Sequence, residues 1–456
     1  MISWGTEAAV ELGEIVRYLD GIPEFAQLCT VDEQNAAVDA LAAEFPAARL
    51  RRIGTSRLGE PLRLLSIGAG PDHALVVGGP HPNEPIGLLT VLVLARLVAG
   101  DPRLRDGVTW DFVPCIDPDG TRMNEGWFTG PHTIRRYHEG FYRPATADQP
   151  EWTFPVTDER AWFDRMLPET QALARVIDEL RPKFQYSLHN TDFGGVFFIL
   201  APEPPGTAED LATVAAAGRV PLALGPIDTL GWESPGPGVY LMPPAESVIE
   251  ASARGVGAVE ARHGGSSTHY ASRHGTTTLI TEVPFWRVPQ AADARDSGQP
   301  YDEVLQRTAG EMRADEAKLA ELARWVQPEL CVPSPVLRAV RDFLVYPVSM
   351  AATHDLVAKA VTGRNATVAE VFGAASVVHM LRMRAASVLR RQLALELAAG
   401  NHTPLLREGY REIDRLFGAW CESAAAEFSE EPYPLRDLVG VQVTAALAVV
   451  RRLGLV

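Results

Sequence analysis

Up to residue 283, the pattern of apolar and polar positions predicts strands and helices that follow one another along the chain. Residues 51–68 predict a hairpin, because two alternating stretches flank a turn that contains Gly59. Short apolar or β-branched runs favour further strands at residues 74–77, 108–116, 184–188, 195–200 and 276–283. Helical periodicity lies between them, at residues 31–45, 87–98 and 168–179. The alternation predicts an α/β fold, a sheet layered by helices with functional residues at strand ends.

Two later parts of the chain have a different texture. Residues 201–275 are rich in proline and glycine, and they predict long loops around one helix at residues 207–217. Long structured loops in a compact domain usually border a site. After residue 330, a linker with two prolines at residues 332–335 is followed by helical patterns at 367–399, 404–427 and 435–453. We therefore expect a first domain at residues 1–330, which contains the sheet, and a helical C-terminal extension at residues 331–456.

Composition excludes several classes of protein. The 456 residues are 46% hydrophobic and 22% charged, as in globular proteins that bury a large core. A net charge of −16 argues against a nucleic-acid or membrane partner. The four cysteines have no paired spacing, so neither a disulfide framework nor a cysteine-type zinc site is expected. The N-terminus has no signal-peptide pattern and the chain has no apolar run of about eighteen residues, so we expect a cytoplasmic protein.

Candidate metal ligands follow two of the expected strands. The strand at residues 74–77 leads through a Gly-Gly-Pro turn into His81 and Glu84, and His189 directly follows the strand at 184–188. Two histidines and one carboxylate are a ligand set that zinc prefers. Glu282, near the end of another strand, could take a proton from water. Each residue alone could equally be an ordinary hydrogen-bonded histidine or strand-end carboxylate.

Several stretches together resemble the zinc carboxypeptidase family over residues 38–285. They follow the order of the family's motifs: the hairpin residues 53–60, the HxxE motif at 81–84, the turn Asp-Pro-Asp-Gly at 117–120, the helix start at 168–173, Ser-Leu-His at 187–189 and Thr-Glu at 281–282. The resemblance implies a mixed, twisted sheet of the eight-stranded type. It also implies one zinc ion per chain, bound by His81, Glu84 and His189, and water activated by the zinc ion and by Glu282 as general base.

The resemblance implies further roles around the substrate. Arg122, just after the 117–120 turn, would polarise the scissile carbonyl and stabilise the oxyanion, and Asn124 would contact the substrate. Arg143 would bind the terminal carboxylate, with Tyr142 standing where the family has asparagine. Arg135 and Arg136 are rivals for Arg143. Tyr270 is the candidate for the tyrosine that closes over the substrate, with Tyr240 as the alternative.

These residues predict a zinc-dependent hydrolase that cleaves a peptide or amide bond, in the first place a cytoplasmic metallocarboxypeptidase. Two alternatives remain open: an N-acyl amino acid deacylase of the aspartoacylase and succinylglutamate desuccinylase type, or a non-catalytic zinc-binding scaffold. The expected partner is a peptide or an N-acylated amino acid, and the helical extension could form a homo-oligomer. Because Tyr142 departs from the family pattern, the sequence supports the hydrolase more firmly than the carboxypeptidase.

Overall fold

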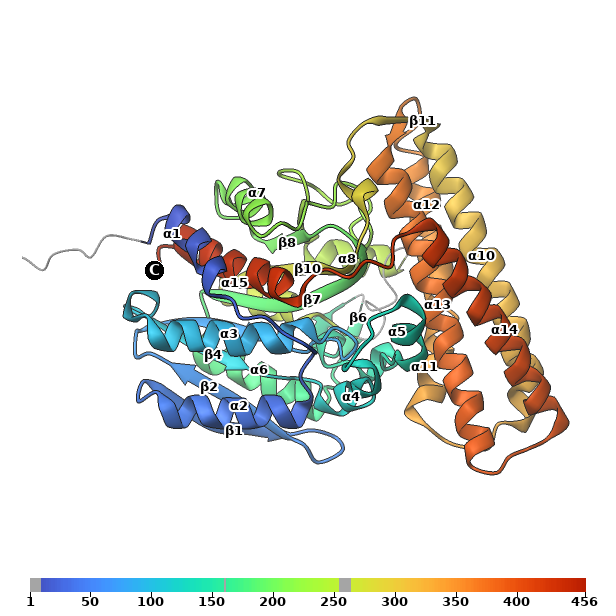
Figure 1. The fold of residues 1–456 in the computed structure, drawn as a ribbon, viewed down its shortest axis with the longest axis horizontal. Coiled ribbons are helices and arrows are strands. Elements are labelled where there is room, and N and C mark those ends of the chain that lie inside the picture. Colours follow the sequence, from blue (N-terminus) through green and yellow to red (C-terminus); the bar gives the residue numbers. More distant parts are fainter. Residues whose placement is uncertain (1–9, 160, 254–263) are drawn as a thin grey trace, which may run out of the picture.

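The computed structural model describes residues 10–159, 161–253 and 264–456 and is built around a mixed eight-stranded sheet (Figure 1). The strand order is β1-β2-β4-β3-β7-β10-β8-β9. The strands are β1 Ala48–Thr55, β2 Pro61–Ile67, β3 Asp72–Val77, β4 Val108–Val113, β7 Phe184–Gly194, β8 Phe197–Ala201, β9 Val239–Leu241 and β10 Thr277–Arg287. Strands β4, β3, β7 and β10 run parallel, whereas β1 and β2 form the predicted antiparallel hairpin. The predicted α/β fold with a mixed sheet is confirmed.

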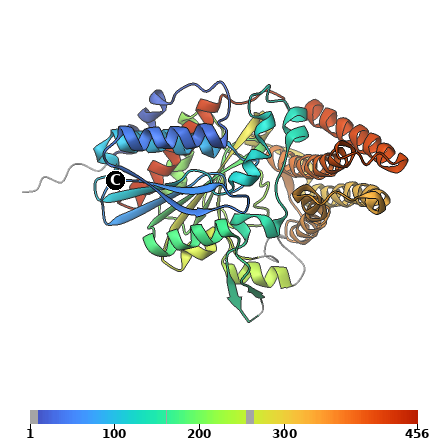
Figure 2. The same ribbon diagram turned by 90° about the horizontal axis from the view of Figure 1, so that it is seen from below.

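Helices cover both faces of the sheet. In Figure 2 the sheet lies between α2, α3 and α15 on one side and α6 on the other. The helices of this part of the chain are α1 Leu12–Arg17, α2 Val31–Glu44, α3 Ile86–Gly100, α4 Pro118–Arg122, α5 Ile134–Gly140, α6 Pro168–Leu180, α7 Thr207–Ala217, α8 Ala245–Ala253 and α9 Ser267–Ser272. Helix α3 approaches β7 closely at Gly87, where a Cβ atom would lie 2.7 Å from the Cβ of Leu188. A side chain at this position would therefore push the helix away from the strand that carries His189.

A second group of helices stands at one end of the sheet (Figure 1). It consists of α10 Tyr301–Val326, α11 Pro335–Phe343, α12 Tyr346–Ala358, α13 Val368–Ala398 and α14 Pro404–Glu427. The long helix α13 begins with a capping box, in which Thr367 and Glu370 each bond the other's backbone N–H. The last helix, α15 Leu435–Arg452, leaves this group and packs beside α3 on the sheet.

The division of the chain at residue 331 stays a prediction. Two helices pack on the other side of this boundary from the one to which their sequence position assigns them. Helix α10, which the sequence analysis did not predict, begins at Tyr301 and packs against α12 and α13. Helix α15, assigned to the extension, covers the sheet. In the segment 201–275, the predicted helix is confirmed as α7, and β9, α8 and α9 lie there in addition. Within the described ranges, no helix has the length and apolar character needed to cross a bilayer.

Three of the family-like stretches meet in one hydrogen-bonded corner. In the β1-β2 turn, Ser56 Oγ donates to Asp119 at 2.7 Å, and the backbone N–H of Leu58 donates to the same carboxylate at 2.9 Å. The N–H of Arg57 donates to Glu169, in the first turn of α6, at 2.9 Å. These motifs therefore fix the hairpin, the 117–120 turn and α6 against one another.

Helix α15 is tied to the strands that carry the candidate site through Gln442. Its buried amide donates to the backbone oxygens of His189 at 2.8 Å and Thr281 at 3.4 Å, and it accepts from Thr90 at 2.6 Å. Replacing Gln442 with leucine should leave these groups without partners and lower the free energy of unfolding by about 1–3 kcal/mol, measured by urea denaturation. The exposed Gln327 is the control, because Gln327→Leu should change it little. Equal stability of the two variants would contradict this role.

Candidate metal centre and active site

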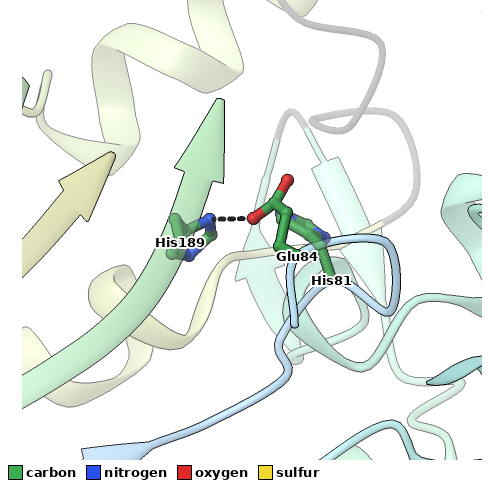
Figure 3. A group of neighbouring side chains, drawn as sticks. All are labelled: His81, Glu84 and His189. Atoms are coloured by element: carbon green, nitrogen blue, oxygen red, sulfur yellow. Dashed lines mark ion pairs between the residues drawn. The ribbon is translucent and has the colours of Figure 1, made fainter. Parts of the chain in front are cut away.

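His81, Glu84 and His189 lie together at the carboxyl ends of the central strands (Figure 3). His81 and Glu84 come from the turn between β3 and α3, and His189 comes from β7. All three side chains are buried, and one ligand atom of each lies within 4.8 Å of the others. The chain folds this way locally because the Gly-Gly-Pro turn ends β3 and reverses the chain before α3 begins. The three predicted ligands are thus brought to one point.

The donor atoms of this cluster fit a zinc ion. The buried Nδ1 of His81 has no hydrogen-bond partner among the described residues. Burial lowers the pKa of His81 well below its usual value, so the ring is neutral and able to bind a metal. His189 Nδ1 lies 3.1 Å from Glu84 Oε2, and its Nε2 shares a 3.0 Å hydrogen bond with Ser187 Oγ, which orients the ring. Two imidazole nitrogens and one carboxylate oxygen therefore face the same point, as zinc requires.

Glu282 stands directly beside this cluster. The parallel pairing of β7 and β10 places Glu282 opposite His189, and Glu282 Oε1 lies 3.5 Å from His189 Nδ1. Burial and the neighbouring charge of Glu84 raise the pKa of Glu282 to about 8. A divalent cation at the cluster would oppose this effect and favour the ionised carboxylate. The predicted general base is therefore in reach of a water molecule at the cluster.

Arg143 also points into the site, from the loop that follows α5. Its Nε donates to Asn83 Oδ1 at 2.9 Å, and its Nη2 contacts the carboxylate of Glu84. Tyr142 and Asn124 lie behind this loop. The Asn124 side chain accepts from the N–H of Tyr142 at 2.9 Å and donates to its carbonyl at 2.8 Å. Neither residue lines the cavity at the cluster. In this structure, Asn124 and Tyr142 hold the Arg143 loop in its position. The contact with substrate that was predicted for them stays a prediction.

Arg122 is not brought to the metal cluster. It ends the short helix α4, and its guanidinium donates to Glu60 and to Asp32, each at 2.6 Å, on the side of α2 and the β1-β2 turn. These two carboxylates hold it away from the cavity, so its predicted oxyanion role has no support in the structure. The rivals of Arg143 are also elsewhere: Arg135 pairs with Glu139 on the surface of α5, and Arg136 donates to a backbone carbonyl.

The two candidate closing tyrosines lie outside the cavity as well. The hydroxyl of Tyr270 donates to Asp178 at 2.9 Å, and the guanidinium of Arg273 lies 3.6 Å from the centre of its ring. Tyr240 is buried in β9 and packs edge-on against Phe197. Neither tyrosine is in a position to contact a group bound at His81 in this arrangement.

A cavity of about 140 Å³ contains the cluster, Glu282 and Arg143. Its other walls were not predicted from the sequence; they are formed by Glu151, Trp152, Asn190, Thr191, Ile199, Asp228, Trp232, Met242, Ile280, Tyr346, Met380 and Arg384. Asn190 directly follows His189, and neither side-chain amide atom has a hydrogen-bond partner within the described parts of the chain. Its position next to a predicted ligand was the signal that could have identified it.

Arg384 reaches the cavity from α13, far along the sequence from the other groups. Its Nη2 donates to Asp192 Oδ1 at 2.8 Å, and its guanidinium lies 5.3 Å from the centre of the Phe141 ring. The hydroxyl of Tyr137 donates to the same carboxylate at 3.2 Å. Although burial alone would raise the pKa of Asp192, the charge of Arg384 and the contact with His138 hold it well below its usual range. The cation is thus fixed at the cavity wall by a buried carboxylate.

The metal centre makes a direct prediction about zinc content. The purified wild type should bind about one zinc ion per chain, measured by inductively coupled plasma mass spectrometry, and His81→Ala and His189→Ala should bind close to none. Ser187→Ala should weaken zinc binding about 10- to 100-fold, because the His189 ring would lose the bond that orients it. His402→Ala, at an exposed position, is the control. Full occupancy in His189→Ala would contradict the assignment.

Comparisons with known proteins give one family match and several similar solved structures. A search of curated proteins finds no match. Among solved structures, bovine thrombin-activatable fibrinolysis inhibitor has 14% identity and a TM-score of 0.36, with coverage of 56% of this chain and 86% of that chain. A metallo-carboxypeptidase from Burkholderia cenocepacia has 18% identity and a TM-score of 0.36, with coverage of 56% and 60%. Carboxypeptidase A from Helicoverpa armigera has 16% identity and a TM-score of 0.37, with coverage of 77% and 74%. Residues 34–215 match the model of the zinc carboxypeptidase family, which confirms the predicted resemblance to that family over the stretch that holds His81, Glu84 and His189.

Proposed function

We propose that the chain is a zinc-dependent hydrolase of the metallocarboxypeptidase type, which cleaves a peptide or amide bond beside a carboxylate-bearing residue. The observation that carries the proposal is the position of Glu282, opposite His189 in the sheet and 3.5 Å from it, next to a ligand set that fits zinc. A scaffold would need the ligands alone. A carboxylate held beside them, in a cavity, supports hydrolysis over the non-catalytic alternative.

Each polar group has a role in this reaction. Zinc held by His81, Glu84 and His189 would polarise the scissile carbonyl and lower the pKa of water. Glu282 takes the proton of the attacking water and passes it to the nitrogen of the leaving group. The planar guanidinium of Arg143 binds the carboxylate of the departing residue.

A deacylase acting on N-acylated amino acids is the second candidate, and one observation is compatible with it. A neighbouring cavity of about 300 Å³ shares Trp152, Trp232 and Met242 with the cavity at the cluster, and its further walls include Phe154 and Ile249. Such an apolar space could take an acyl chain as well as an apolar peptide side chain. Both reactions use the same zinc ligands, base and carboxylate clamp.

Location and assembly are proposed from the sequence alone. We propose that the protein is cytoplasmic and that its partner is a peptide or an N-acylated amino acid. We propose neither a nucleic acid nor a membrane as a partner. A homo-oligomer would form through the group of helices α10 to α14. Light scattering coupled to size-exclusion chromatography measures its mass directly.

The role of Glu282 makes the first prediction of this proposal. Glu282→Gln should keep the zinc content of the wild type but lower kcat about 100-fold or more, because an amide cannot accept the proton of water. Peptides with a free C-terminus and N-acylated amino acids are the substrates, and release of the amino acid is measured. Glu303→Gln, at an exposed position on α10, should keep wild-type activity. An active Glu282→Gln variant would exclude the general-base role.

Arg143 makes a second prediction. Arg143→Met should lower kcat/KM about 100-fold for peptides with a free C-terminus and should change hydrolysis of the same amidated peptides little, because only the former present a carboxylate to the guanidinium. Zinc content is measured in parallel, since Arg143 also contacts Glu84. Arg136→Met is the matched control. Loss of the preference in Arg136→Met, with Arg143→Met unaffected, would assign the clamp to the rival residue.

A further inference from the structure

A series of buried hydrogen bonds runs from Arg143 to Asp192, a carboxylate to which the proposed reaction assigns no role. Arg143 Nε donates to Asn83 Oδ1 at 2.9 Å, and Asn83 Nδ2 donates to the hydroxyl of Tyr137 at 3.1 Å. That hydroxyl donates in turn to Asp192 Oδ1 at 3.2 Å. The three residues of this Asp192–Tyr137–Asn83 network are each at most 1% exposed. They come from β7, from α5 and from the turn after β3, so the network joins three separate elements.

Both ends of the network can act in one direction only. An ionised carboxylate carries no proton, so Asp192 accepts and the Tyr137 hydroxyl must donate to it. The Nε of an arginine only donates, so Asn83 Oδ1 must face Arg143. The two conditions agree, because the hydroxyl oxygen of Tyr137 is left to accept from Asn83 Nδ2, which turns Oδ1 toward Arg143. The orientation of the Asn83 amide is therefore fixed from both sides.

Asp192 is itself held firmly at its end of the network. Arg384 Nη2 donates to the same Oδ1 at 2.8 Å, and Oδ2 lies 3.4 Å from His138 Nε2. Burial alone would raise the pKa of Asp192, but these neighbours hold it well below its usual range, so the carboxylate keeps its acceptor character. Because Arg384 belongs to α13, the network also connects that helix to Arg143.

The Tyr137 hydroxyl is what selects one of the two orientations of the Asn83 amide. If the amide were turned over, Nδ2 would face the Nε of Arg143, and two donors would meet without a bond. Arg143 would then keep only its contact with the carboxylate of Glu84. A guanidinium binds a carboxylate most tightly when its plane is already fixed, because ordering a mobile side chain costs free energy on binding.

We propose that Asp192, Tyr137 and Asn83 are positioning residues, which hold the guanidinium of Arg143 in the plane that binds the carboxylate of the substrate. The inference rests on the proposed function, because it takes Arg143 as the group that binds this carboxylate. None of the three residues lines the cavity at the cluster, so each acts through Arg143 and not on the substrate. The position of the cation thus depends on α5, on β7 and, through Arg384, on α13.

The experiment measures binding to the zinc-loaded Glu282→Gln protein, in which turnover is blocked, by isothermal titration calorimetry. The ligands are acetyl-alanyl-phenylalanine and its C-terminal amide. Adding Tyr137→Phe should weaken binding of the acid about tenfold and leave binding of the amide unchanged, because only the carboxylate depends on the plane of Arg143. Adding Tyr186→Phe, which removes another buried tyrosine hydroxyl, should leave both affinities unchanged.

Asn83→Ala removes the amide through which Tyr137 acts and gives a second test. In the same protein it should weaken binding of the acid at least as much as Tyr137→Phe does. Combining the two changes should add nothing to the effect of Asn83→Ala alone, because the two residues act in series. Zinc content is measured in every variant, since Asn83 directly precedes Glu84.

The exchange of the Arg143 Nε–H with water gives a readout that needs neither ligand nor turnover. Its signal in the nitrogen-15 NMR spectrum is identified by its absence in Arg143→Met. In Tyr137→Phe this proton should exchange about tenfold faster than in the wild type, because its bond to Asn83 opens more often. Tyr186→Phe should keep the wild-type rate.

Two results overturn the proposal. One is an affinity for the acid in Tyr137→Phe that equals the affinity in Tyr186→Phe. The other is an exchange rate of the Arg143 Nε–H that Tyr137→Phe leaves unchanged.

The failure of this inference is distinct from that of the proposed function. If the wild type hydrolyses neither ligand but Tyr137→Phe selectively weakens binding of the acid, the positioning role stands and hydrolysis fails. If the wild type hydrolyses the acid and Tyr137→Phe does so with the same KM, hydrolysis stands and the positioning role is overturned.

Discussion

The parallel pairing of β7 with β10 is the constraint on which the candidate site depends. It sets His189 beside Glu282 across the two strands, so a candidate metal ligand and a candidate proton acceptor become neighbours through strand pairing alone. A shift of one residue in this register would turn one of the two side chains to the opposite face of the sheet. The long runs of buried residues in both strands, which pack between two helical layers, resist such a shift. Strand pairing thus positions Glu282, just as the turn after β3 positions His81 and Glu84.

The helices α10 to α14 complete the cavity that the sheet begins. Arg384 and Met380 come from α13, and the buried ion pair between Arg384 and Asp192 joins this helix to β7 only three residues beyond His189. A buried ion pair of this kind contributes little net stability, because desolvation offsets the attraction. Its effect is on position, since Asp192 fixes the direction of a cation at the cavity wall. Helix α13 therefore forms part of the cavity wall, although it lies outside the stretch that matches the family.

The sequence allowed the ligand turn, His189 and Glu282 to be predicted because each follows a short apolar run whose strand character is local. The walls of the cavity could not be predicted in this way. Residues on α13 are apolar around most of the helix, so periodicity does not show which side faces β7, and Arg384 is identified only by its contact with Asp192. Helix α10 is a different case: Val304, Thr308 and Met312 recur at helical spacing and could have predicted it. The pairing of Arg122 with Asp32 and Glu60 could not be predicted, because both partners are distant in sequence and nothing local indicates them.

The position of α15 near the end of the chain affects the order in which the parts of the candidate site can come together during synthesis. During synthesis His81, Glu84, His189 and Glu282 all emerge before α13, which supplies Arg384, and before α15, whose Gln442 bonds the backbone of β7 and β10. Five α-helices separate β10 from α15 in the described part of the chain, so this contact closes a long loop and forms late. A nascent chain that already contains the candidate ligands and Glu282 therefore still lacks part of the cavity wall and the helix that supports β7 and β10. The candidate site therefore has all of its walls and its support only after the chain has been made through α15.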